Sequence, residues 1–441
     1  MRSSHSLDRL DTAFDDDRLV AAAGLLLPAT LAHHLGLREL VDAHLDLDDK
    51  PGRANPGDKL LTLVMSALAG GDSIDDADAL RAGGTARILG HVVKAASTLG
   101  TFLRSFRWGH VRQLDRVSRD LLARAWAAGA GPGSEPFTID LDSTICETYG
   151  LAKEGALHHG YTGVRGYHPL LAVAAGTGDV LMARLREGRA NTVRGAAHFL
   201  AETIGRVRAA GASGQLTMRA DSGFYACEVV GVCRKMGVRF SITIRQHRSV
   251  RRLIEAIPEE AWTPIPYWIA GGADVAETTY TPFATEKDAR AVRLIVRRVK
   301  PTPGSQLALL TLYDFHAFIT DRDGQTLELE ADHRRHAEIE NAIRDLKYGV
   351  GLNHLPSGKF AANGAWLAVQ VIAHNLARWT ARLGLGAGIV TTKTLRRRLF
   401  AVAGRLTRSA RRVTLHLPAR WPWAAEFTAA LARLRAIPLL A

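Results

Sequence analysis

The sequence predicts a mixed α/β protein whose sheet is interrupted by a β-rich insertion, with a helical region before it and a basic region after it. Three observations predict this class. Apolar residues recur at helical spacing up to about residue 130, a Gly- and Pro-rich linker (GAGPGSEP) occupies 129–136, and from Phe137 onward apolar and polar residues alternate as in a strand. With 441 residues, the chain is long enough for two or three domains, or for one large domain carrying an insertion.

The region 1–130 is expected to be helical. Apolar periodicity runs through 18–46, 58–70 and 110–128, with glycine breaks at 70–71 and 83–84. The longest apolar stretch, 19–37, contains Pro28 and two histidines and follows three aspartates, so it predicts a soluble helix and neither a signal peptide nor a membrane span.

The segment 137–245 is expected to form the first part of a sheet domain. In order, it shows a strand over 137–143, a hairpin around Gly176–Asp179, a helix over 191–211 that Asn191 caps and Gly211 ends, a strand that ends at Asp221, a helix near 225–236 and a strand over 239–245.

The segment 246–330 interrupts this scheme and is interpreted as a β-rich insertion. It holds a helical piece at 250–257 and strand-like runs at 291–299 and 307–313. Residues 331–385 then complete the sheet domain with helices at 338–349 and 361–383, and 386–441 form a basic C-terminal region. Within that region, 393–412 is expected to be a helix with one basic and one apolar face.

Charge is distributed unevenly along the chain. The formal net charge is +13, residues 1–135 are close to balanced, and no Asp or Glu occurs between Asp345 and Glu426, a stretch of eighty residues with thirteen Lys or Arg. A long segment of one sign is typical of proteins that face a polyanion, and we expect that polyanion to be nucleic acid. The alternatives are a generally Arg-rich composition and, for 393–412, a membrane-surface helix.

The cysteines are few and odd in number, at 146, 227 and 233, and no two form a CxxC pair. This pattern excludes a disulfide scaffold, disfavours a structural zinc site and predicts a reducing, cytoplasmic location.

Three acidic residues stand where they could meet. Asp142 and Asp221 lie at or near strand ends, and the strand order can bring those two strands side by side; Glu340 borders the apolar stripe of the helix 338–349, with Lys347 two turns after it. Three close carboxylates repel one another unless a cation lies between them, and oxygen ligands suit Mg²⁺ or Mn²⁺. Two such ions support phosphodiester cleavage and transfer. For each acid alone, turn capping or a solvated charge is the ordinary explanation.

The motifs DLDST (140–144), RADSGFY (219–225) and HAEIENAIRDLKYG (336–349) resemble the three acid motifs of bacterial insertion-sequence DDE transposases, specifically the group with a β-rich insertion before the third acid. That group shows Tyr, Arg, Glu and Lys with two, three and six residues between them. The spacing is kept here by His333, His336, Glu340 and Lys347, but both the Tyr and the Arg are replaced by His. This replacement brings the phosphate-gripping role of the Arg into question.

The resemblance implies a ribonuclease-H-like catalytic domain, two Mg²⁺ (or Mn²⁺) ions held by Asp142, Asp221 and Glu340, and Asp140 as an alternative or supporting ligand. Arg219 lies on the same strand face as Asp221 and is expected to neutralise it. The residues expected to contact DNA are Lys347, His336, His333, Arg344, Arg396, Arg397, Arg398, Arg411 and Arg412.

Two further groups of residues carry candidate functional side chains. The segment HHGYTGVRGYHP (158–169) contains His158, His159, Arg165 and His168. We expect it to be a DNA-contacting loop at the rim of the active site; the alternatives are a zinc site and an ordinary polar turn. Trp262 and Trp268 lie in the insertion, where a core or interface role is favoured over stacking on a flipped base.

The function expected from the sequence is a DNA transposase of an insertion sequence that binds its terminal inverted repeats through 1–130, cleaves them and transfers the freed strands. We expect a homodimer on DNA and a bacterial, cytoplasmic and nucleoid-associated location. The alternatives are a non-mobile metal-dependent nuclease of the same fold and a DNA-binding protein that has lost catalysis.

Overall fold

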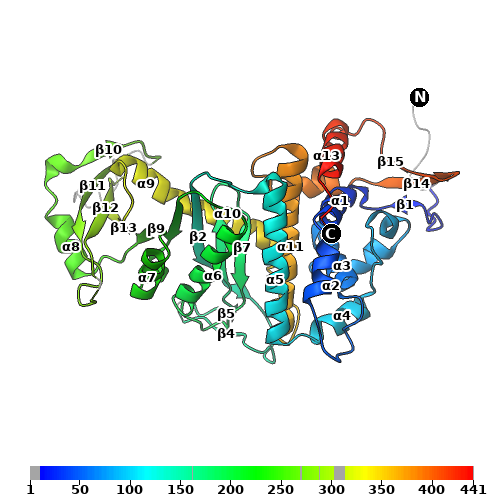
Figure 1. Ribbon diagram of the computed structural model, residues 1–441, viewed down its shortest axis with the longest axis horizontal. Helices are drawn as coiled ribbons and strands as arrows, with labels where there is room; N and C mark the ends of the chain where they lie inside the picture. Colours follow the sequence, from blue (N-terminus) through cyan, green and yellow to red (C-terminus); the bar gives the residue numbers. More distant parts are fainter. Residues whose placement is uncertain (1–9, 161, 269–270, 288, 302–312, 441) are drawn as a thin grey trace.

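A computed structural model describes residues 10–160, 162–268, 271–287, 289–301 and 313–440. The molecule is elongated (Figure 1): the insertion strands β10–β13 and helix α8 lie at one end, the central sheet lies in the middle, and the N-terminal helices share the other end with the C-terminal elements. The first and the last labelled elements, β1 (Leu19–Val20) and α13 (Ala424–Ala436), lie at the same end of the molecule.

The central feature is a mixed sheet. Among the described residues it has nine strands in the order β10-β11-β12-β13-β9-β8-β2-β6-β7. The strands are β2 (Phe137–Ser143), β6 (Leu170–Ala174), β7 (Val180–Arg184), β8 (Leu216–Ala220), β9 (Arg239–Thr243), β10 (Thr263–Ile265), β11 (Ala273–Tyr280), β12 (Val292–Val299) and β13 (Asp314–Thr320).

The first five strands of this sheet along the chain are β2, β6, β7, β8 and β9, and their order across the sheet is β7-β6-β2-β8-β9. β2 pairs in parallel with β8 and antiparallel with β6, and β8 pairs in parallel with β9. A helix, α6 (Ala196–Ala209), crosses from β7 to β8, and α7 (Cys227–Lys235) crosses from β8 to β9. This order confirms the predicted ribonuclease-H-like mixed sheet.

Burial explains the sequence pattern of these strands. Every residue of β6 and β8 is buried; β6 is a continuous apolar run, as expected for a strand covered on both faces, whereas β8 also buries Thr217 and Arg219. β2 is central as well, yet it carries Asp140 fully buried and Asp142 half-buried at its C-terminal end. Buried charges need partners, so β2 marks a site rather than plain core.

The helices of the N-terminal region pack beside the sheet through α11 (Phe360–Trp379), which is buried along nearly its whole length. The predicted periodic stretches correspond to α1 (Leu26–His34), α2 (Leu37–His44), α3 (Pro56–Ala69) and α5 (Trp108–Ala125), and α4 (Ala96–Arg104) is additional. The first stretch begins with the short strand β1 (Leu19–Val20) instead of a helix, because Leu19 and Val20 pair with β14. The helix predicted from Asn191 begins at Ala196, where Gly195 with a φ of 75° supplies the turn.

The insertion extends the sheet directly. β13 pairs with β9, and β12, β11 and β10 follow outward, so strands from the two parts form one continuous hydrogen-bonded surface. α8 (Arg248–Glu255) matches the predicted helical piece and β12 matches the predicted strand at 291–299. The strand predicted at 307–313 lies, apart from Tyr313, outside the described residues.

The helix predicted over 338–349 is part of a longer broken segment. α9 (Thr326–Arg334) leads through a 3₁₀ turn (Arg335–Glu338) to α10 (Ile339–Arg344), and a π-helical turn (Asp345–Gly349) ends it. Ile339, Ala342, Ile343 and Leu346 are buried as the apolar stripe predicts, and Glu340 is exposed.

The helix predicted over 393–412 is wrong in its second half. A short helix, α12 (Thr392–Leu395), continues as a π-helical turn (Arg396–Phe400), and the chain then forms an antiparallel ribbon of β14 (Gly404–Ser409) and β15 (Arg412–His416), followed by α13 (Ala424–Ala436). Only Val413 and Leu415 of β15 alternate with polar residues, and the single apolar residue Leu406 of β14 is paired with Leu415, so the ribbon depends on pairing between strands.

Candidate functional site

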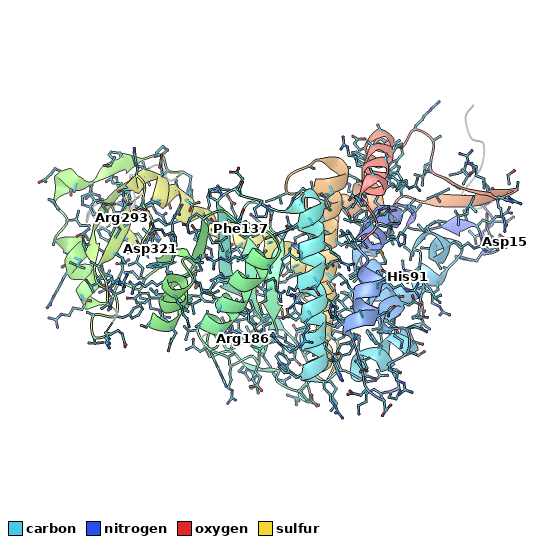
Figure 2. The ribbon with its side chains drawn as sticks, viewed as in Figure 1. Asp15, His91, Phe137, Arg186, Arg293 and Asp321 are labelled. Carbon is cyan, nitrogen blue, oxygen red and sulfur yellow. The ribbon has the colours of Figure 1, made fainter. Side chains whose placement is uncertain are left out.

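The candidate site lies at the C-terminal ends of β2 and β8. In Figure 2, Phe137 marks the edge of the sheet at which β2 begins. Arg186, which follows β7, marks the opposite edge, at which β2 and β7 end. In the parallel pairing of β2 with β8, Leu141 is the partner of Ala220. The next residues, Asp142 and Asp221, therefore lie side by side where the two strands end.

Each of these two aspartates is oriented by the backbone that follows it. The N–H of Ser143 donates to Oδ1 of Asp142 at 2.6 Å, and the N–H of Gly223 donates to Oδ1 of Asp221 at 2.9 Å. In the second case Asp221 acts as the N-cap of a 3₁₀ turn (Ser222–Phe224). Asp142 is half-buried, whereas Asp221 is exposed.

Asp142 lies within electrostatic range of Asp221 and Glu340. The pKa of Asp142 is raised to about 6, mainly by burial; the Ser143 amide and His336 act against this rise, and the charges of Asp221 and Glu340 make smaller upward contributions. Glu340 is exposed on α10, the helix that packs beside this edge. The charges of both other acids thus act on Asp142, and the convergence of the three acids at one metal site stays a prediction.

The carboxylates are not assembled into a finished metal site. Within the ranges that the structure describes, no three His, Cys, Asp or Glu side chains are grouped closely enough to hold a metal ion. The donor set nevertheless fits a hard divalent cation in its chemistry, because it offers only carboxylate oxygens.

Asp140 has a different environment from Asp142. Arg219 of β8 donates to both carboxylate oxygens of Asp140, from Nε at 2.7 Å and from Nη2 at 2.8 Å, and both side chains are almost fully buried. The same guanidinium reaches Asp332 in α9 at 3.2 Å, and Arg322 also pairs with Asp332. The prediction that Arg219 neutralises Asp221 is therefore corrected: its partners are Asp140 and Asp332.

The two histidines that replace the family's Tyr and Arg point into the protein. Nδ1 of His336 lies 3.0 Å from Oδ1 of Asp140. The ring of His333 stacks on Phe318 with centroids 4.0 Å apart, and its nitrogens lie 2.7 Å from the Ser241 hydroxyl and 2.9 Å from the Thr243 hydroxyl. Burial lowers the pKa of His333 well below its usual value. Both histidines thus join the third-acid segment to the sheet, which replaces the predicted contact with DNA by a structural one.

Lys347 lies near the end of β2. Its Nζ donates to the carbonyl oxygen of Ile145 at 2.8 Å, so the ammonium group lies beside the backbone three residues after Asp142. Arg344 is exposed and contacts only Asn341 among the bonds described, at 3.3 Å.

Sequence reasoning did not foresee the role of His168. It is buried after β5 (Arg165–Tyr167), with Nδ1 2.8 Å from the Ala190 carbonyl and Nε2 2.9 Å from the Ser143 hydroxyl. Since a carbonyl can only accept, the N–H is on Nδ1 and Ser143 donates to Nε2. His168 therefore holds the residue that follows Asp142. The signal in the sequence was only a His near a turn.

The loop that carries His158, His159 and Arg165 is folded against a small sheet. Among the described residues this sheet has the strands β3 (Cys146–Glu147), β5 and β4 (Leu157–His158), and it continues from the end of β2. Arg165 donates to the carbonyls of Gly150 and Leu151, so its guanidinium is bound to its own loop. His158 is exposed at this rim.

The predicted basic residues of the C-terminal region divide into two groups. Arg396 donates to the carbonyls of Leu68, Ala67 and Gly349, which ties α3 to the third-acid segment, so its role is structural. The side chains that are exposed are those of Arg397, Arg398, Arg411 and Arg412. In the insertion, the guanidinium of Arg298 lies 4.4 Å from the centre of the Trp262 ring, and Trp268 is 85% exposed.

No helix in the described part of the chain is both long and apolar enough to cross a membrane. A search of curated proteins found no match. Among solved structures, the chain is similar to a piggyBac transposase determined by cryo-EM as a synaptic complex with hairpin DNA, with 12% identity, a TM-score of 0.48 and coverage of 86% of this chain and 80% of that chain.

The family comparison covers nearly the whole sequence. The model of the family described as "Transposase DDE domain group 1" matches residues 3–439. Its extent includes all three acid motifs, the ribonuclease-H-like sheet and the insertion between β9 and α9. The chain therefore belongs to the DDE transposases, a family of enzymes that cleave and transfer DNA.

Proposed function

We propose that this chain is the transposase of a bacterial insertion sequence, which binds the terminal inverted repeats of its element, cleaves there and joins the freed 3′ ends to target DNA. The observation that carries the proposal is the register of β2 with β8, which puts Asp142 beside Asp221 under the electrostatic influence of Glu340. In a cell, the enzyme acts in the bacterial cytoplasm on the nucleoid.

Asp142, Asp221 and Glu340 are the residues that would hold two Mg²⁺ or Mn²⁺ ions. When bound, such ions activate an attacking water or 3′-hydroxyl and stabilise the leaving oxygen of a phosphodiester. The chain itself orients the ligands: the amides of Ser143 and Gly223 fix one oxygen of each aspartate, and His168 fixes the Ser143 hydroxyl. Lys347 is assigned to a phosphate of the cleaved strand, since its ammonium lies at the end of β2.

Asp140 is assigned to support rather than to metal binding, because Arg219 occupies both of its oxygens. Through His336 it also holds the segment that leads to Glu340. The exposed arginines Arg344, Arg397 and Arg398 are assigned to the DNA backbone. Because each subunit would supply one active site to one element end, the active species is a homodimer bound to two ends.

The test uses duplexes taken from both flanks of the gene, with Mg²⁺ or with EDTA. Wild-type protein should cut at the element boundary only with the divalent ion, and Asp142→Asn, Asp221→Asn and Glu340→Gln should each lower cleavage by about a thousandfold or more while still binding the duplex. Cleavage by any of these variants at the wild-type rate would contradict the assignment.

Pre-cut ends separate the remaining candidates. Joining of pre-cut ends to a plasmid supports a transposase, whereas cleavage without joining indicates a non-mobile nuclease of the same fold. The inward-facing His333 and His336 and the unassembled carboxylates favour, as the second candidate, a DNA-binding protein without catalysis. That candidate predicts specific binding with neither reaction.

A further inference from the structure

The ribbon of β14 and β15 is an exposed arm at the end of the molecule opposite the insertion. Figure 1 shows it extending away from the helices, and Figure 2 shows Asp15 at the same end, with Arg293 and Asp321 toward the other end. The two strands pair antiparallel from Arg405 with His416 to Ser409 with Arg412, and the turn between them is only Ala410 and Arg411.

The two faces of the ribbon differ in chemistry. Because partners across an antiparallel pair share a face and alternate residues change face, one face carries Leu406 and Leu415, with Arg408 and Val413 toward the tip, and the other face is polar. The apolar face is anchored, since Leu406 is buried in a small core with Val20, Ala23 and Val402. The polar face consists of Arg405, Thr407, Ser409, Arg412, Thr414 and His416.

All six side chains of the polar face can form hydrogen bonds, and none is acidic. Ser409, Arg412 and His416 are exposed, and Thr407 and Thr414 are half-buried side by side. At the base of the ribbon, Arg405 forms an ion pair with Asp16 at 3.2 Å, so its charge is already neutralised within the protein.

The tip of the ribbon is strongly basic. Arg408, Arg411 and Arg412 are exposed within five residues, and within the described part of the chain none of the three forms an ion pair. The nearby acids Asp15, Asp16 and Asp17 belong to the segment before β1, which pairs with β14 on the side away from β15. The tip and the β15 side are therefore open and positive.

The charge also selects the partner. β15 is an edge strand, and a second copy of the chain could in principle add to it. Such pairing would bring two sets of three arginines together without an acid on either ribbon, which costs free energy through like-charge repulsion. Duplex DNA has the opposite charge, and its major groove is wide enough to admit a two-stranded β-ribbon.

We propose that the β14–β15 ribbon is a DNA-binding arm that seats its polar face in a groove of duplex DNA. Arg412 on that face, Arg411 in the turn and Arg408 at the tip of the other face contact the phosphates. This inference rests on the proposed function in that it takes the DNA to be that of the element. It locates a duplex contact in the C-terminal region, in addition to the end-binding role proposed for the helices of 1–130.

The first experiment compares two charge-matched triple variants. Arg408→Gln/Arg411→Gln/Arg412→Gln removes the ribbon cations, and Arg248→Gln/Arg251→Gln/Arg252→Gln removes three equally exposed arginines from α8 at the far end of the molecule. Affinity for a duplex from the gene flank and for a scrambled duplex is measured in EDTA across a range of salt concentrations. Circular dichroism verifies that both variants are folded.

The ribbon variant should bind the flank duplex on the order of tenfold more weakly, with a log K against log salt slope smaller by roughly one per arginine. The α8 variant should match the wild type. Equal losses in both variants would indicate a general charge effect and overturn the proposal, as would wild-type affinity of the ribbon variant. A changed sedimentation mass with unchanged DNA affinity would assign the ribbon to a second copy instead.

A second measurement reports on position rather than on charge. Ser409→Cys on the polar face and Ser249→Cys on α8, each in a Cys227→Ser background because Cys227 is the exposed native cysteine in the described part, are labelled with an iron chelate that cuts nearby DNA. Discrete cuts from position 409 and none from position 249 support the arm, and cuts from neither position contradict it. Both binding measurements are independent of cleavage, so loss of the proposed catalytic function and loss of the arm give different results.

Discussion

At the scale of single residues, the site shows how two aspartates on one strand face acquire different roles. Asp140 and Asp142 are two residues apart and share a face, but only Asp140 lies opposite Arg219 in the register of β2 with β8. The bidentate pair fully occupies Asp140 and leaves Asp142 to interact with Asp221 and Glu340. The identity of the candidate ligand thus follows from the position of one arginine.

The Arg219 network should contribute strongly to folding. Arg219→Met leaves Asp140 and Asp332 without their shared cation in a buried place, so the free energy of unfolding should fall by about 3–5 kcal/mol. Urea unfolding measures the change, with Arg189→Met, at an exposed position, as the control. Adding Asp140→Asn to Arg219→Met should restore part of the loss, because it removes one unpaired charge. A loss of less than about 1 kcal/mol for the single variant would show that water compensates the carboxylates.

The sequence could predict part of this arrangement. Asp142 and Asp221 follow from strand order and spacing alone, since parallel neighbours that end together place their next residues side by side. The inward orientation of His333 could not be predicted, because its partners Ser241 and Thr243 lie on β9 and become neighbours only through tertiary packing. Spacing within the third-acid motif therefore identified the residues but not the direction of their side chains.

At the scale of elements, the core strands and the long helices were predictable, and the segment 393–412 was not. A short stretch with apolar residues at mixed intervals fits both helical and strand periods, and the decisive feature, the pairing of β14 with β1 nearly 400 residues away, is invisible in the sequence. Leu406 of the ribbon is buried against Val20 and Val402. Tertiary contact thus overrides local preference there.

The connection from β5 to β6 should make stability depend on pH. Burial lowers the pKa of His168 to about 4, below the usual value for an unfolded chain, so the unfolded state binds more protons between about pH 6.5 and 4. The stabilisation is present above pH 6.5 and is lost as the pH falls through this window. Since the ring is only 3% exposed, we expect a loss on the order of 3 kcal/mol over this window.

The measurement for His168 is the free energy of unfolding at pH 7 and at pH 4.5 for the wild type and for His168→Gln. The amide of glutamine can accept from Ser143 but does not titrate, so the variant should lose less stability than the wild type on acidification. Carboxylate titration acts on both proteins equally and cancels in the comparison. If the free energy of unfolding fell by the same amount in both proteins, protonation of His168 would not destabilise the folded state, and the prediction would be wrong.

At the scale of the whole molecule, the insertion is part of the sheet and not an appendage. β13 pairs with β9, and the small core of Ile265, Val275, Ile295, Phe318 and Leu329 lies between the outer strands and α9. Phe318 in turn stacks on His333, at the start of the segment that carries Glu340. The insertion therefore supports the third acid mechanically, which explains why a β-rich segment occurs directly before it in the chain.

If the sheet unfolds as one cooperative unit, a substitution that destabilises the outer strands must also destabilise β2, which carries Asp142. Ile295 is fully buried, so Ile295→Ala should lower the free energy of unfolding by about 2–5 kcal/mol, and amide hydrogen exchange should speed up in β2 as well as in β12. Ile389→Ala, at a position 54% exposed, serves as the control and should change stability by less than about 0.5 kcal/mol. Faster exchange confined to β10–β13 would mean that the outer strands unfold independently, and the support of Glu340 through Phe318 and His333 would then have to come from β9 alone.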